Sequence, residues 1–248
     1  MAETLRWPSS LKKQANRVQK QAARNNAFSL EFLIVGFLTG AVLFFIAHRY
    51  VKNATLGFLF SLSGILIMVI IAYGRKMLSI NFERDKLEKG ISGELTVANE
   101  LNNLPDGWFI INDTVVNGSQ IDHIAIGPTG IYCIETKNWN NAGCDENGVW
   151  YRFHLGHWVP LDKSPAEQNI RHILSLKKFL IEKTRLDISL TSIVVLANPN
   201  GKFNIESRVV PPGDTRICLP NELYQLLSGS GGIVLSPDEV NNVARILT

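Results

Sequence analysis

Residues 120–138, QIDHIAIGPTGIYCIETKN, contain two short apolar runs separated by the turn sequence Gly-Pro-Thr-Gly. This pattern predicts an antiparallel pair of strands on either side of the turn. Side chains alternate faces along a strand, so Glu135 and Lys137 point the same way. Asp122, on the first strand, is expected to come close to Glu135 across the pair. Charged groups on an otherwise apolar hairpin are costly to bury unless they bind something, and a divalent cation is an obvious partner.

The types of side chain indicate which ion this would be. Hard oxygen ligands without a nearby cluster of His and Cys suit Mg²⁺ or Mn²⁺ rather than Zn²⁺. Such an ion polarises a phosphoryl oxygen and lowers the pKa of a bound water. We therefore expect Asp122 and Glu135 to be metal ligands, and Lys137 to position water or neutralise charge on the phosphate. Taken alone, the three residues also fit a cross-strand salt bridge on a solvated face.

The flanking segments carry a family resemblance. Gly93-Glu94 opens the amphipathic run GELTVANELNNLP, the strand-like FIINDTVV follows, and SPAEQNIRHILSLKKFL comes after a Trp-bearing region. This order resembles the nuclease-related domain (NERD), a branch of the PD-(D/E)xK phosphodiesterase superfamily, over about residues 90–200. The resemblance implies an α/β, restriction-endonuclease-like core that depends on Mg²⁺. Its central mixed sheet would have about four strands flanked by helices.

The resemblance also implies roles for particular residues. The family positions fall on five polar side chains: Glu94, Asp122, Glu135, Lys137 and Gln168. From the residues alone, Glu94 also fits a carboxylate that favours the first turn of a helix, and Gln168 fits a surface position near a helix start. His123 adjoins Asp122 but faces the other way, so we expect it to be structural or exposed at an edge.

Two apolar stretches near the N-terminus are long enough to span a bilayer. Residues 32–47 carry no charge and reach spanning length from residue 27, and residues 54–73 are a second uncharged stretch. Because only helices and closed barrels satisfy the backbone in lipid, we expect a transmembrane helical hairpin over residues 27–74. The alternatives are a buried pair of globular helices and a cleaved signal peptide, which the long basic leader and the second stretch disfavour.

Lys and Arg residues predict the orientation of this hairpin. Six precede the first stretch, two lie in the connecting loop 48–53, and five follow the second stretch before residue 90. The positive-inside rule then gives a multi-pass protein of the inner (cytoplasmic) membrane with both termini in the cytosol. The basic arm, residues 1–26, is expected to lie on anionic lipid, with DNA as the rival partner. Gly36 and Gly40 have the spacing of helix contacts, so a homo-oligomer is an open alternative.

The rest of the chain reads as a linker helix over residues 75–89 and a nuclease-related domain over 90–248. The three cysteines are odd in number and lack CxxC spacing, which indicates neither a zinc site nor a disulfide framework. Apolar spacing and turn residues predict these elements: helices 81–104 (with a break at 90–93), 166–183, 221–227 and 237–247; strands 108–116, 120–127, 130–137, 192–196 and 216–219; and a hairpin within 148–159.

These observations together predict a membrane-anchored, cytosol-facing, divalent-metal-dependent nuclease that hydrolyses nucleic-acid phosphodiester bonds, with DNA as the first expectation for its partner and RNA as the open alternative. The competing hypothesis is a membrane-tethered nucleic-acid-binding or scaffold module that keeps the fold without useful turnover. Three tryptophans invite a base-stacking role, although packing is the commoner use of such residues on hairpins: Trp139, Trp150 and Trp158.

Overall fold

The computed structural model describes residues 1–6, 54–154, 156–184, 188–229 and 232–248, with a few positions between 38 and 49. The chain divides into two compact units. One is Lys12–Glu88, and the other joins Met1–Leu11 to Lys89–Thr248. We call the second the globular unit, and it contains every candidate site residue.

Helix α2 runs from Ala54 to Asn102 without interruption. It joins the second apolar stretch to the helix expected at 81–104, so the expected break at 90–93 is wrong. Among the described residues, α2 is the one helix long and apolar enough to cross a membrane, with a window of mean hydropathy 2.2 that is only 6% buried. The first apolar stretch and the connecting loop 48–53 lie largely outside the described residues, so the hairpin stays a prediction.

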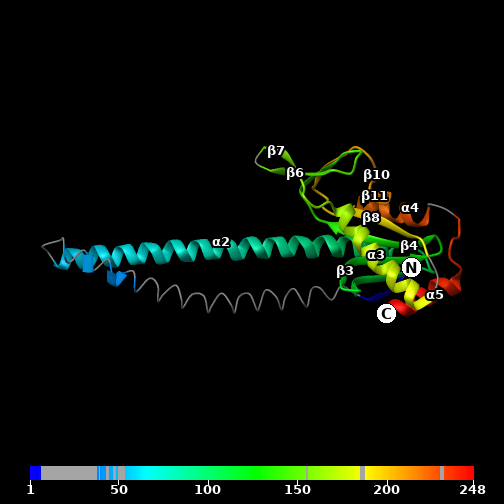
Figure 1. Cartoon of the computed structure of the whole chain (residues 1–248), viewed down its shortest axis with the longest axis horizontal. Coiled ribbons are helices and arrows are strands. Elements are labelled where there is room, and N and C mark those ends of the chain that lie inside the picture. Colours follow the sequence, from blue (N-terminus) through cyan, green and yellow to red (C-terminus); the bar gives the residue numbers. More distant parts are fainter. Residues whose placement is uncertain are drawn as a thin grey trace. The chain divides into compact units, whose positions relative to one another are not determined.

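The globular unit is built on a seven-stranded mixed sheet with the order β1-β2-β3-β4-β8-β11-β10 (Figure 1). The resemblance implied about four strands, so the sheet is larger than expected. The three strands expected around the Gly-Pro-Thr-Gly turn are confirmed as β2, β3 and β4. The bounds are β1 Glu3–Arg6, β2 Phe109–Val116, β3 Ser119–Gly127, β4 Gly130–Lys137, β8 Leu190–Leu196, β10 Val209–Val210 and β11 Thr215–Cys218.

Strand β1 was not anticipated from the sequence. It pairs in parallel with β2, placing Glu3 opposite Phe109, and so forms one edge of the sheet. The amino group of Met1 lies 2.6 Å from Asp106 Oδ1, and the Thr4 hydroxyl donates to the Asn102 side chain. The first residues of the chain are therefore part of the globular unit.

A second, four-stranded sheet has the order β7-β6-β5-β9. The hairpin expected within 148–159 is its β6–β7 pair, whereas β5 and β9 were not expected. Its inner face packs on the large sheet through a core that includes buried Trp150, Val194 and Leu196. The bounds are β5 Asn141–Cys144, β6 Trp150–His154, β7 His157–Pro160 and β9 Lys202–Ile205.

Helices cover both faces of the large sheet (Figure 1). Helices α3 and α5 pack on one face, where Ile173, Leu176 and Leu180 of α3 join a core with the strands, as the apolar spacing of that helix predicts. The end of α2 and helix α4 pack on the other face. Ser236 caps α5 as expected, since its hydroxyl accepts from Glu239 N at 3.3 Å. The bounds are α3 Pro165–Thr184, η1 Pro220–Glu222, α4 Leu223–Ser228 and α5 Pro237–Leu247.

Candidate active site

The first pair of site residues meets where β3 and β4 part. The last register pair of the two strands is His123 with Ile134, so Asp122 and Glu135 are opposite one another one step beyond it. In place of a backbone acceptor, Asp122 Oδ2 accepts a hydrogen bond from the Thr136 amide at 2.9 Å. Asp122 is thereby fixed beside Glu135, as the strand periodicity predicted.

Lys137 and Gln168 complete a chain of contacts from Glu135. The Lys137 ammonium donates to Glu135 Oε1 at 2.6 Å and to Gln168 Oε1 at 3.1 Å. The Glu135 side chain is 2% exposed and that of Lys137 20% exposed, so the pair is largely withdrawn from water. Gln168 stands in the first turn of α3. Ser164 caps the start of this helix, since its Oγ accepts a hydrogen bond from Glu167 N. Helix α3 therefore places the side-chain amide oxygen of Gln168 against the ammonium group of Lys137, the candidate catalytic lysine.

His172 is a neighbour that the sequence analysis missed. It lies one helical turn after Gln168, and its Nε2 is 3.4 Å from Glu135 Oε2. The two side chains on α3 also approach one another, with Gln168 Nε2 3.4 Å from His172 Nε2. The signal was present in the sequence, because residues four apart on a helix share a face. Glu135 is thus held between Lys137 and His172.

Glu94 reaches the site from α2 because Gly93 lets that helix approach the sheet. A Cβ on Gly93 would lie 2.7 Å from Asn138 Cβ and 3.4 Å from Ala197 Cβ. At the start of the same turn, Asn138 Nδ2 donates to Lys89 O at 2.5 Å. The negative charge of Glu94 is near enough to Asp122 to raise the pKa of that carboxyl. The Gly-Glu pair therefore works as a unit, in which the glycine permits the contact and the glutamate supplies the charge.

The carboxylates of the site have opposite pKa shifts. Burial raises the pKa of Asp122 well above its usual value, and the charges of Glu135 and Glu94 add to that rise against the Thr136 amide and Lys137. Burial also raises the pKa of Glu135, but its contacts with His172 and Lys137 prevail, so the net pKa is lowered. Glu135 is therefore the stably charged carboxylate, and Asp122 is the one whose ionisation is opposed.

His123 takes no part in this cluster. Its side chain is fully buried, with Nδ1 2.7 Å from Asn112 Oδ1, so it is structural rather than exposed at an edge. Burial lowers the pKa of His123 to about 4, with the charges of Glu135 and Asp113 opposing that fall. A histidine with such a pKa is neutral near pH 7, which suits a packing role.

The polar side chains rest on a buried network between α3, β4 and β8. Asn169, next to Gln168, donates to Cys133 O at 2.8 Å, to Ser192 Oγ at 2.9 Å and to Ile193 O at 3.1 Å. Its own oxygen accepts from the Cys133 thiol at 3.2 Å. Because Asn169 is completely buried and fully hydrogen-bonded, it fixes the start of α3 against the strands.

The carboxylates of the candidate site are possible ligands for a divalent ion. Among the described residues, no group of three or more His, Cys, Asp or Glu side chains is arranged to hold a metal. Mg²⁺ asks for less, since one or two carboxylates with waters and substrate phosphates commonly suffice. Asp122 and Glu135 face each other, and within the described residues the buried Glu135 Oε2 has only the 3.4 Å approach of His172 Nε2, without a well-formed hydrogen bond. These two carboxylates fit such an ion.

Comparison with known proteins agrees with this geometry. Residues 89–197 match the family model of the nuclease-related domain. An uncharacterized protein of Bacillus anthracis is 25% identical over 163 residues, an alignment that covers 62% of this chain and 73% of the relative. No solved structure matches. The stretch from residue 89 to residue 197, which includes all five site residues and His172, is a nuclease-related domain.

Proposed function

We propose that this protein is a membrane-anchored, cytosol-facing nuclease that requires Mg²⁺ or Mn²⁺ and acts on nucleic acid, with DNA as the first substrate to test and RNA as the second. The observation that carries the proposal is the joined set of Asp122, Glu135 and Lys137 at neighbouring strand ends, tied to Gln168 on α3. The set lies inside the nuclease-related domain. Three elements, β3, β4 and α3, supply it, which is more than an incidental surface salt bridge requires.

Each residue has a task in this proposal. Asp122 and Glu135 would hold the ion, which when bound supplies charge stabilisation to the phosphate and an acidified water. Lys137 is close enough to Glu135 to orient a water at the same place or to neutralise charge on the phosphate. Gln168 keeps the lysine directed at the site, and Glu94 adds a third carboxylate next to Asp122.

Membrane attachment is supported by α2 and by the pairing of β1 with β2. Strand β1 and the nuclease-related domain share one sheet, so they must lie on the same side of any membrane. A single crossing by α2 would separate them. An even number of crossings between β1 and residue 89 is therefore required, which favours the hairpin proposed from the sequence, and the basic flanks favour the cytosolic side.

Calorimetry and plasmid nicking on the full chain in lipid nanodiscs test the enzyme proposal. Mn²⁺ is titrated into the wild type and into Glu135→Gln, and DNA and RNA cleavage are followed in the same samples. We expect saturable Mn²⁺ binding and nicking in the wild type and loss of both in the variant. Nicking that survives in Glu135→Gln would refute this site as the catalytic centre.

Cysteine labelling tests the orientation. The native cysteines Cys133, Cys144 and Cys218 are buried, so an introduced cysteine is the main target of an impermeant maleimide. In intact cells, Asn53→Cys in the connecting loop should react, whereas Asn103→Cys in the globular unit should react only after lysis. Reaction of both, or of Asn103→Cys alone, in intact cells would overturn the cytosolic placement.

One observation favours the alternative of a tethered binding or scaffold module. Glu135 already has Lys137 and His172 as neighbours, and no three-ligand cluster is found among the described residues. A site satisfied in this way keeps the fold without an ion. Nucleic-acid binding that is equal in the wild type and in Glu135→Gln, with no Mn²⁺ binding and no cleavage by either, would establish this alternative.

A further inference from the structure

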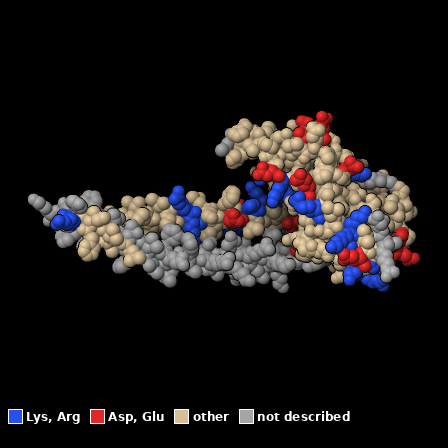
Figure 2. Space-filling model, viewed as in Figure 1, with Lys and Arg blue, Asp and Glu red and all other residues tan. Residues whose placement is uncertain are grey.

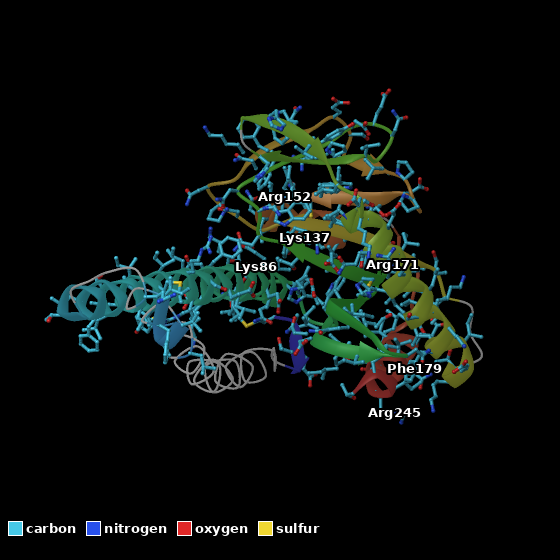
Figure 3. All side chains as sticks on the ribbon, turned by 60° about the vertical axis from the view of Figure 1, so that its left-hand side comes forward. Lys86, Lys137, Arg152, Arg171, Phe179 and Arg245 are labelled. Carbon is cyan, nitrogen blue, oxygen red and sulfur yellow. The ribbon has the colours of Figure 1, made fainter. Side chains whose placement is uncertain are left out.

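Trp139 stands between two cations at the edge of the candidate active site. It follows Lys137 by two residues, and the Lys137 ammonium lies 6.0 Å from the centroid of its ring. The Arg152 guanidinium carbon lies 5.4 Å from the same centroid. Figure 3 shows the labelled Lys137 and Arg152 near one another, with Arg245 at the far end of the globular unit. The two positive groups and the ring form one continuous surface.

Arg152 is held in this place by the small sheet. It belongs to β6 and is in register with Ala142 of β5. Trp150, two residues earlier on the same face, is 1% exposed and meets Trp139 edge-on, with centroids 6.1 Å apart and planes at 78°. The Trp139 ring is thus fixed by a buried aromatic neighbour, which leaves little freedom for the guanidinium above it.

The charge of Arg152 is available to a ligand. The side chain is exposed, and among the described residues no carboxylate lies within salt-bridge distance of it. An arginine that stacks on an aromatic ring keeps its outward N–H groups free for phosphate oxygens. Its neighbour Lys137 already faces the place proposed for the scissile phosphate.

The opposite face of the small sheet has the wrong charge for a polyanion. Alternation along β6 turns Tyr151 away from Arg152 and into a cavity of about 370 Å³. That cavity is lined by carboxylates, among them Asp145 and Glu206. Figure 2 shows acidic side chains at the upper end of the globular unit, where the small sheet lies. The face of the small sheet that bears Tyr151 is therefore acidic, and the face that bears Arg152 is the one that suits a phosphate backbone.

We propose that Arg152, stacked on Trp139, binds a backbone phosphate of the nucleic-acid strand whose neighbouring phosphodiester is presented to Lys137. The proposal deepens the nuclease assignment and rests on it for the role of Lys137. Arg152 is then a substrate-binding residue that sets where the strand enters the site. Trp139 is the platform that couples strand position to the catalytic lysine.

Binding without turnover tests this proposal. The full chain in nanodiscs of neutral lipid is titrated into a fluorescein-labelled 30-nucleotide DNA, with Ca²⁺ in place of Mg²⁺, at several NaCl concentrations, and anisotropy is read. Arg152→Gln should weaken binding about tenfold, since charged hydrogen bonds are the strong ones, and should reduce the salt slope by about 0.7–0.9. Arg152→Lys should keep the slope and lose part of the affinity.

Arg245→Gln is the matched control, because it removes the same charge from an exposed position on α5 far from Lys137 (Figure 3). It should leave the affinity and the slope unchanged. Equal melting temperatures for both glutamine variants would show that neither effect is structural. Arg152→Gln that behaves as Arg245→Gln in affinity and slope would overturn the proposal.

The outcomes separate this proposal from the nuclease assignment. Binding that depends on Arg152 without any cleavage in Mn²⁺ would support the phosphate site at Arg152 and refute the nuclease assignment. Cleavage by the wild type, with DNA binding that does not depend on Arg152, would support the nuclease assignment and refute the phosphate site at Arg152. A wild type that binds no nucleic acid under any salt condition would refute both.

Discussion

Lys137 Nζ lies 2.6 Å from Glu135 Oε1, with a single residue between them on β4. The lysine compensates a carboxylate that is only 2% exposed. We expect Lys137→Met to reduce the free energy of unfolding by about 3 kcal/mol, because it leaves the buried Glu135 carboxylate with His172 as its remaining basic neighbour. Urea denaturation followed by tryptophan fluorescence measures the change. Lys178→Met, on an exposed position of α3, is the control, and an equal effect of the two would contradict the argument.

Asp122→Asn should make the protein more stable at neutral pH. The pKa of Asp122 is raised in the folded state, so folding opposes its ionisation at any pH above that raised value. As the pH falls from the raised pKa toward the ordinary value of 3.8, the folded wild type binds its proton first and recovers stability. The gain from Asn should be present at neutral pH and should shrink with acid.

The measurement is a set of urea titrations of both proteins between pH 4 and pH 9. Asn at this position keeps an oxygen that accepts from the Thr136 amide, so the hydrogen bond is not the variable. A variant that is less stable than the wild type at pH 8 would contradict the predicted sign.

Gly90 and Gly93 are both in α2 and should respond in opposite ways to alanine. No atom lies within 4 Å of a Cβ added at Gly90, so Gly90→Ala should stabilise the helix by about 0.5–1 kcal/mol. A Cβ at Gly93 would press on Asn138, so Gly93→Ala should cost about 1–3 kcal/mol and move Glu94 away from Asp122. Thermal melts of the pair give the comparison, and two changes of the same sign would be evidence against the close approach.

Asn169→Leu should be among the most destabilising single changes in the globular unit. It removes the donor to the carbonyls of Cys133 and Ile193, at about 1–3 kcal/mol for each acceptor left unsatisfied, whereas Ser192 Oγ still accepts from the Thr215 hydroxyl. We therefore expect a total of about 3 kcal/mol or more, read from urea denaturation. The same substitution at exposed Asn241 on α5 should stay within about 0.5 kcal/mol. Similar losses at both positions would show that the network is not the cause.

The central strands and α3 could be predicted because their signals are local. The run from Gln120 to Lys137 alternates around a recognisable turn, and the apolar spacing of α3 follows its own period. Strands β1, β5 and β9 have four residues each, too few to show a clear alternation, and β1 and β9 pair only with segments distant in the chain. Gly90 and Gly93 of α2 suggested a break, yet packing of Val97 and Leu101 on the sheet overrides the low helix propensity of these two glycines.

The residues of the candidate site likewise divide into those that the local sequence predicts and those that depend on tertiary packing. Strand periodicity alone brings Asp122, Glu135 and Lys137 together, and the structure has them in contact or opposite one another. His172 needed only the register of α3 relative to Gln168, a signal that was present and not used. The place of Arg152 could not be read from the sequence, because it depends on how the small sheet lies against the end of β4.

Strand β1 also has a consequence for the order of events during synthesis. Its residues leave the ribosome before those of its partner strand β2, which follow about a hundred residues later, as the separation of 105 between Met1 and Asp106 indicates. At about 5–20 residues per second, β2 emerges roughly 5–20 s after β1. The apolar segment of α2 is made within that interval. Strand β1 therefore has to wait for its partner until that apolar segment has been made.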